Sequence, residues 1–233
     1  MKSTTTFFLR AMRTNLVAAI LGASIGLVAA QSPDPAAMAG QYAANAKQNA
    51  TVMRQYSWQM RVEVTLKGEP KPAQLYQMRF DADGKPQKTL LSAPQEEPKG
   101  RGLRGRIKAN KIEDFKEWAA KLAELVKNYM APSPGTMLDF YAKAALSPSP
   151  DGTVQVSAGG FINPGDRAVY WLDKETKVPR RFVFETKLEG DAVKATAEFG
   201  QVQGGPQYVA RLTIDVPAKK VSAKIENYNY QRQ

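Results

Sequence analysis

Apolar and polar residues alternate without interruption in the segment 56–66, YSWQMRVEVTL. The apolar positions would share one face of an extended chain: Tyr56, Trp58, Met60, Val62, Val64 and Leu66. The residues between them are polar or charged, so the pattern predicts a β-strand with one covered face and one solvated face. The function depends on what covers the apolar face, which is either the protein's own core or a bound molecule.

The same period of two returns in several later segments. Two further strands are predicted at 75–81 and 87–94, after a turn at 67–72 whose two prolines cannot lie within a central ladder. Six more strands are predicted towards the C-terminus, at 153–162, 167–173, 178–188, 192–202, 208–216 and 221–230. Short polar turns such as NPGD and EGD join them, which favours antiparallel neighbours.

Three segments have helical patterns instead. Residues 36–54 are rich in helix formers, and residues 111–130 carry apolar side chains at helical spacing. Asn110 is the expected N-cap of the second helix, with Glu113 three residues later as in a capping box. A shorter helix is predicted at 135–146.

These elements predict an α+β fold of one domain. About eight or nine strands would form one strongly curved antiparallel sheet, an incomplete β-barrel with a polar outer side. The helices are too few to form a layer of their own, so we expect them to cover the concave apolar face of the sheet.

The N-terminal segment has the features of a secretory signal peptide. It carries no carboxylate, and its run LVAAILGASIGLV is too short to span a bilayer comfortably. Small residues precede the expected cleavage point Ala30/Gln31. We therefore assign residues 1–30 to a signal peptide and residues 31–233 to a single domain, the competing interpretation being an uncleaved membrane anchor.

The composition narrows the compartment and the chemistry. The chain has no cysteine, so an exported domain would fold without disulfides and without a lipidated N-terminal cysteine; a soluble periplasmic protein fits best. It also has no histidine, and with both residue types missing, serine–histidine, cysteine and zinc chemistry are excluded. The acidic pairs Glu96/Glu97 and Asp81/Asp83 lie in predicted loops and turns. We predict no catalytic residue, no metal site and no cofactor.

A basic, glycine-containing segment, 95–111, follows the third strand. The chain's net charge of +11 and this segment suggest an anionic docking patch formed by Lys99, Arg101, Arg104 and Arg106. Its partner would be an anionic membrane surface or an acidic envelope protein. A mobile basic loop with no partner is the alternative. Nucleic acid is not expected, because the segment lacks aromatic residues for base stacking.

The apolar face of the sheet is the other candidate site. Methionine adapts to irregular apolar ligands, and six methionines are spread over the early strands and the helices. The candidate cavity residues are Trp58, Met60, Val62, Val64, Met78, Phe80, Phe115, Leu122, Phe140, Phe182, Phe184 and Leu212. The alternative is that these residues form an ordinary filled core.

The order of these elements resembles the periplasmic lipoprotein carrier superfamily of the LolA/LolB type, which includes outer membrane lipoprotein-sorting proteins. The similarity is most concrete in NPGDRAVYWLDKETKVPRRFVFET, residues 163–186, and in the closing strand IENYNY, residues 225–230. The resemblance implies an incomplete barrel with a helical lid around a hydrophobic cavity. No counterpart of the arginine-bearing strand motif of the true carriers is found, so no arginine is assigned a role.

Together these features predict a soluble, periplasmic, non-enzymatic protein that binds lipid or lipoprotein acyl chains between sheet and helices. The alternative is an envelope scaffold or stress sensor with a filled core and no ligand.

Overall fold

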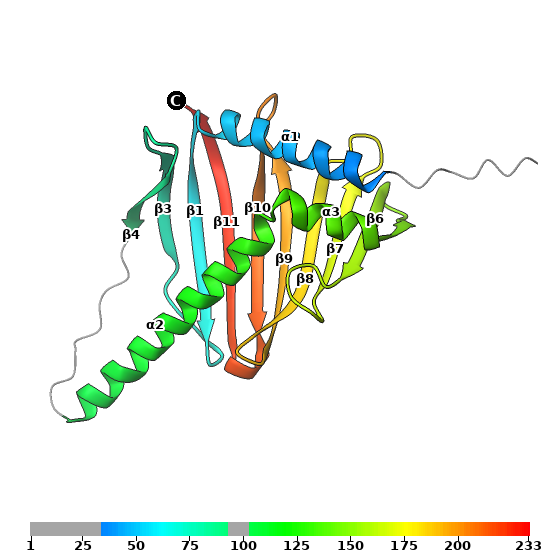
Figure 1. The fold of residues 1–233 in the computed structure, drawn as a ribbon. Helices are drawn as coiled ribbons and strands as arrows, with labels where there is room; N and C mark the ends of the chain where they lie inside the picture. The colour runs from blue at the N-terminus through cyan, green and yellow to red at the C-terminus, as the bar shows by residue number, and fades with distance from the viewer. Residues whose placement is uncertain (1–33, 93–102) are drawn as a thin grey trace, which may run out of the picture. The chain divides into compact units, whose positions relative to one another are not determined.

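The computed structural model describes residues 34–92 and 103–233, with the side chains of 103–113 left out of the description. The described residues fall within one compact unit, Pro33–Gln233 (Figure 1). The predicted signal peptide and its cleavage point lie outside the described residues, so their assignment stays a prediction.

One antiparallel sheet holds all eleven strands that the described residues form. The strands are β1 (Tyr56–Leu66), β2 (Glu69–Pro70), β3 (Gln74–Phe80), β4 (Pro86–Ser92), β5 (Ala145–Pro148), β6 (Thr153–Gly159), β7 (Arg167–Asp173), β8 (Pro179–Leu188), β9 (Asp191–Gln201), β10 (Gln207–Val216) and β11 (Val221–Arg232). Their order is β4-β3-β1-β11-β10-β9-β8-β7-β6-β5, with β2 paired to β1. The first long strand thus pairs with the last, and the sheet is not closed into a barrel. The predicted α+β class is confirmed.

The helices are α1 (Pro35–Met53), α2 (Leu103–Met130) and α3 (Pro134–Lys143), and a short 3₁₀ helix, η1 (Pro217–Lys219), lies between β10 and β11. In the chain, α2 and α3 lie between β4 and β5, which are the two opposite edges of the sheet. The chain must therefore cross the sheet here. Ten strands at about 4.8 Å spacing make a sheet about 43 Å wide, and the 28 residues of α2 make a helix about 42 Å long.

Two local predictions are wrong. The second helix begins at Leu103 and not near Lys111, so Asn110 lies inside it and is not its N-cap. The glycines and basic residues of this stretch hid the helix formers that it also contains. Helix α3 ends at Lys143, and the residues after it form the edge strand β5, which pairs with β6. The predicted turn at 67–72 is confirmed, and the two residues of β2 within it pair with β1.

The ends of α1 and α3 are fixed by side chains. Asp34 caps α1 by accepting a hydrogen bond from the backbone of Ala36, and Ser133 caps α3 by accepting one from Thr136. The Asn49 side chain of α1 bonds both the backbone N–H and the carbonyl of Gln207, at 2.7 and 2.9 Å. This pair of bonds ties α1 to the start of β10.

Large and small residues alternate across the strands beneath the helices. Phe182 and Phe184 of β8 lie opposite Ala197 and Ala195 of β9. The phenyl rings fill the space that the alanines leave, and all four residues are 1% exposed. This face, which we call the helix side, is therefore densely filled at β8 and β9.

Candidate functional site

The helix side of the sheet has a filled end, where β6 to β9 meet α3 and the C-terminal half of α2. Six aromatic rings pack together there: Tyr129, Phe140, Phe161, Tyr170, Phe182 and Phe184. Tyr170 stacks on Phe182 with centroids 4.0 Å apart, and Tyr129 stacks on Phe184 at 4.2 Å. None of the six is more than 7% exposed. An acyl chain could enter this end only by displacing these rings.

A buried polar cluster fastens α2 to the filled end. The Tyr129 hydroxyl donates to the Asp166 carboxylate and lies 2.9 Å from the Thr186 hydroxyl. Asp166 also accepts a hydrogen bond from the backbone N–H of Asn163 at 2.6 Å. Burial, together with the Asp166 carboxylate, raises the pKa of Tyr129 well above its ordinary value. The cluster satisfies a buried carboxylate, so it holds the end of α2 in one position.

The same side of the sheet is less completely covered at β1 and β3. In the register with β11, Val62 lies opposite Ile225 and Val64 opposite Ala223, so both valines point to the helix side. Met60 points the same way, opposite Tyr76 of β3. We call Met60, Val62, Val64, Tyr76 and Met78 the open face.

The open face differs from the filled end in burial. Met60, Val62, Val64 and Tyr76 are partly exposed, while Met78 is buried. None of the five is among the described residues that pack in or against the filled core. The open face is therefore an apolar surface that the described core does not use.

An aromatic group borders the open face at the start of β1. Trp58 stacks on Tyr230 at 5.6 Å and lies 5.5 Å from Phe80. The Trp58 indole N–H donates to the Asn227 side chain at 3.1 Å, and Asn227 in turn donates to the carbonyl of Val209 at 2.8 Å. A bulge in β11, with Asn229 at φ 55°, places Tyr230 beside Trp58.

Helix α2 carries an unsatisfied polar atom. The indole nitrogen of Trp118 is buried and has no hydrogen-bond partner among the described residues. Trp118 is 7% exposed and belongs to the filled core, next to Phe115 at 5.7 Å. A buried N–H without an acceptor costs about 1–3 kcal/mol. This donor would gain from an acceptor brought by another molecule.

The predicted cavity residues fall into two groups. The filled core contains Leu122, Phe140, Phe182, Phe184 and Leu212, with Phe115 packed against it. The open face and its aromatic border contain Trp58, Met60, Val62, Val64, Met78 and Phe80. The second group lies together on β1 and β3 and is the candidate site.

The predicted anionic docking patch cannot be placed. Lys99 and Arg101 lie outside the described residues. Arg104 and Arg106 lie in the first turns of α2, and their side chains are outside the description.

Sequence reasoning missed Tyr76, Tyr230 and Trp118 as candidates. The alternation in residues 225–230 gave a usable signal for Tyr230, but its place beside Trp58 depends on the pairing of the first and last strands. Nothing in the sequence signals that the Trp118 N–H lacks an acceptor.

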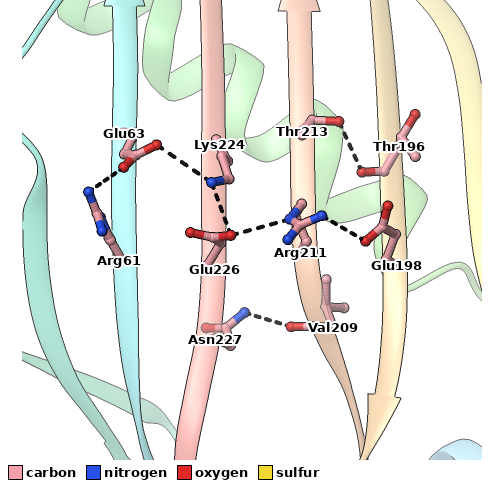
Figure 2. Close-up of polar contacts among 10 residues, drawn as sticks. All are labelled: Arg61, Glu63, Thr196, Glu198, Val209, Arg211, Thr213, Lys224, Glu226 and Asn227. Carbon is pink, nitrogen blue, oxygen red and sulfur yellow. Dashed lines mark hydrogen bonds and ion pairs between the residues drawn. The ribbon is translucent and has the colours of Figure 1, made fainter.

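The opposite face, which we call the outer face, carries an ion-pair network over β1, β11, β10 and β9 (Figure 2). Arg211 bonds both Glu198 and Glu226, at 3.2 and 3.3 Å, and Lys224 joins Glu226 to Glu63. Arg61 closes the network on Glu63 at 2.6 Å. Hydrogen bonding to Lys224 lowers the pKa of Glu226. The charges of this half of the outer face thus satisfy one another.

In the described part of the chain, no group of three or more carboxylates could hold a metal ion. No helix within 34–92 and 103–233 is long and apolar enough to cross a membrane.

Comparison with known proteins gives structural similarity only. No protein-family model matches the chain, and no curated protein matches it. A DUF1329 family protein from Desulfovibrio piger shares 10% identity over 86% of this chain and 94% of its own, with a TM-score of 0.42. A protein domain from Vibrio parahaemolyticus, described as outer membrane lipoprotein-sorting, shares 11% identity over 85% and 93%, with a TM-score of 0.47.

A LolA superfamily protein from Nitrosomonas europaea is also similar, with 10% identity over 80% of this chain and 91% of its own and a TM-score of 0.35. Two of these three structures are an outer membrane lipoprotein-sorting domain and a LolA superfamily protein, which belong to the group that residues 163–186 resemble. At such identities and TM-scores the similarity assigns neither a family nor a ligand to the chain.

Proposed function

We propose that this chain is an exported, non-enzymatic protein that binds an acyl chain of a lipid or lipoprotein against the open face. One observation carries the proposal: Met60, Val62 and Val64 point to the same side as the core but stay partly exposed and outside it. A continuous apolar strip of this kind is costly to leave in water.

The chemistry of the strip suits a flexible hydrocarbon. Methionine, valine and aromatic rings offer no charge and adapt to a chain without fixed shape. Burial of about sixteen carbons gives on the order of 10 kcal/mol before the costs of association and ordering. The net affinity would be moderate, which suits a protein that must also release its ligand.

Lipid uptake tests the proposal directly. The protein purified from cells would be examined by native mass spectrometry for bound lipid and titrated with a fluorescent fatty acid. Replacing Val62 and Val64 together by threonine keeps their shape but adds hydroxyls to the open face, and should weaken uptake about tenfold or more. Val183→Thr, which makes the same change on the outer face, should leave uptake unchanged.

A lipid-free protein that takes up no fatty acid would contradict this function. The filled aromatic end of the sheet would then favour the second candidate, an envelope scaffold or sensor without a ligand. Export is tested separately, because a processed periplasmic protein should begin at Gln31.

A further inference from the structure

A hollow of about 150 Å³ lies on the outer face, over β6, β7 and β8. Its lining residues are Gln155, Arg167, Val169, Trp171, Val183 and Glu185. These residues point away from the helices, because their neighbours Ala168, Tyr170, Phe182 and Phe184 are buried on the helix side. The hollow is therefore separate from the open face.

The strand register explains why the sheet is hollowed here. Ser157 and Gly159 of β6 lie opposite Val169 and Arg167 of β7. Ser157 has a small side chain and Gly159 has none, which leaves space beside an apolar floor, and Val169 in that floor is only 5% exposed. Trp171 and Gln155, which are also cross-strand partners, form one wall.

The charges around the hollow are unbalanced. Glu185 is paired with Lys194 at 3.1 Å, and Arg181 lies over the Trp171 ring at 5.0 Å. Arg167 makes no ion pair with any described residue, although Glu185 lies opposite it in the register. In the network of Figure 2, by contrast, each cation contacts a carboxylate. Among the residues that line the hollow, Arg167 is thus a cation with no carboxylate partner in the described part of the chain.

The volume of the hollow suits a single side chain of a partner better than a free small ligand. Sites for free small ligands are about 300–1,000 Å³, whereas this hollow has about 150 Å³. That is room for a single side chain. Tryptophan and arginine are also the residue types that dominate binding energy at protein interfaces.

We propose that this hollow is a docking point for a partner protein and receives one acidic side chain of that partner. Its carboxylate would form charge-assisted hydrogen bonds with the Arg167 guanidinium, and its methylenes would pack on Trp171 and Val169. The docking point does not depend on acyl-chain binding, since it lies on the other face of the sheet.

The three tryptophans of the chain make a selective test possible. Trp58 borders the open face, Trp118 lies in α2 and Trp171 lines the hollow. With ¹⁵N-labelled indoles, the full chain is titrated with the acetylated, amidated peptide Leu-Glu-Leu. The Trp171 resonance should shift in a saturable way, while the Trp58 resonance should not move.

Three controls separate docking from general charge attraction. The peptide Leu-Gln-Leu should bind at least about tenfold more weakly, and so should free propionate. The Arg167→Ala variant should bind the Leu-Glu-Leu peptide at least about tenfold more weakly than the parent protein does. Arg79→Ala removes an equal charge from an exposed position on β3 and should have no effect.

A Trp171 resonance that does not respond to the Glu peptide would overturn the proposal. So would equal binding of the Gln peptide, or an unchanged affinity in Arg167→Ala. Propionate binding as tightly as the peptide would assign the hollow to a small carboxylate and would overturn the protein-partner assignment.

Discussion

The β6–β9 end of the sheet and its β1–β3 end are built from similar alternating strands, yet the helices pack them differently. At the first end, phenyl rings of β8 lie beside alanines of β9, and α2 and α3 complete a layer with almost no exposure. At the second end, valines and methionine of β1 remain partly exposed and lie outside that core. The comparison shows that one sheet can hold both a structural core and an apolar surface that stays partly exposed.

The difference arises from side-chain size and from where α2 is fastened. Tyr129 at the end of α2 is bound to Asp166 and Thr186, next to β7 and β8. The helix is thus held firmly where the core is filled.

Removing a phenyl ring at each end of the sheet should reveal the difference in packing most clearly. Phe184→Ala should lower the free energy of unfolding by about 3–5 kcal/mol, because it opens a cavity in a filled core. Phe80→Ala should cost less than half as much, because Phe80 is partly exposed. Denaturant unfolding of both variants measures the difference, and equal losses would show that the two ends are packed alike.

Removing one hydroxyl at each end is a finer version of the same test. Tyr129→Phe takes a donor from the buried Asp166 and should cost about 1–3 kcal/mol. Tyr230→Phe should be nearly neutral, since the Tyr230 hydroxyl makes no hydrogen bond with any described residue. Denaturant unfolding of both variants measures the difference. A Tyr129→Phe variant as stable as the parent protein would show that the cluster does not hold α2 in place.

Alkaline pH should destabilise the protein partly through a tyrosine that packs against the filled core. Burial raises the pKa of Tyr141 from 10.0 to about 12. The unfolded chain therefore loses this proton first, so stability should be full below pH 10 and fall as the pH rises towards 12. The free energy of unfolding measured between pH 8 and pH 11 should follow this course, with a shallower fall in Tyr141→Phe. An identical slope in that variant would exclude this tyrosine as a source of the effect.

The ion pairs of the outer face should have the smallest effect. Glu226→Gln should lower the free energy of unfolding by no more than about 1 kcal/mol, and less at high salt, because the network is partly exposed. The loss should be fully present at neutral pH and vanish as the pH falls through the lowered pKa of Glu226. Thermal unfolding at two salt concentrations checks this, and a loss above 2 kcal/mol would mean that the network is a major source of stability.

Local patterns in the sequence predicted most of the elements. The alternation of residues 56–66 coincides with β1, and that of 167–173 coincides with β7. The start of α2 was missed because glycines and charges outweighed the helix formers around Asn110. Such errors arise where local composition gives mixed signals.

The site was harder to predict than the fold. Alternation identified Val62 and Phe184 equally as residues of an apolar face, and it carries no information on which of them the helices bury. That distinction depends on the pairing of β1 with β11 and on the position of α2. Both are long-range features, which one strand's sequence does not contain.

The central claim is that the open face takes up an acyl chain while the filled end and the outer face do not. Titration of the ¹⁵N-indole-labelled chain with a sixteen-carbon fatty acid tests it most directly, because the three tryptophans report on three regions. The account predicts a saturable shift of the Trp58 resonance, while Trp118 of the filled core and Trp171 of the outer face stay unmoved. An unmoved Trp58 at saturating fatty acid, or equal shifts at all three tryptophans, would contradict it.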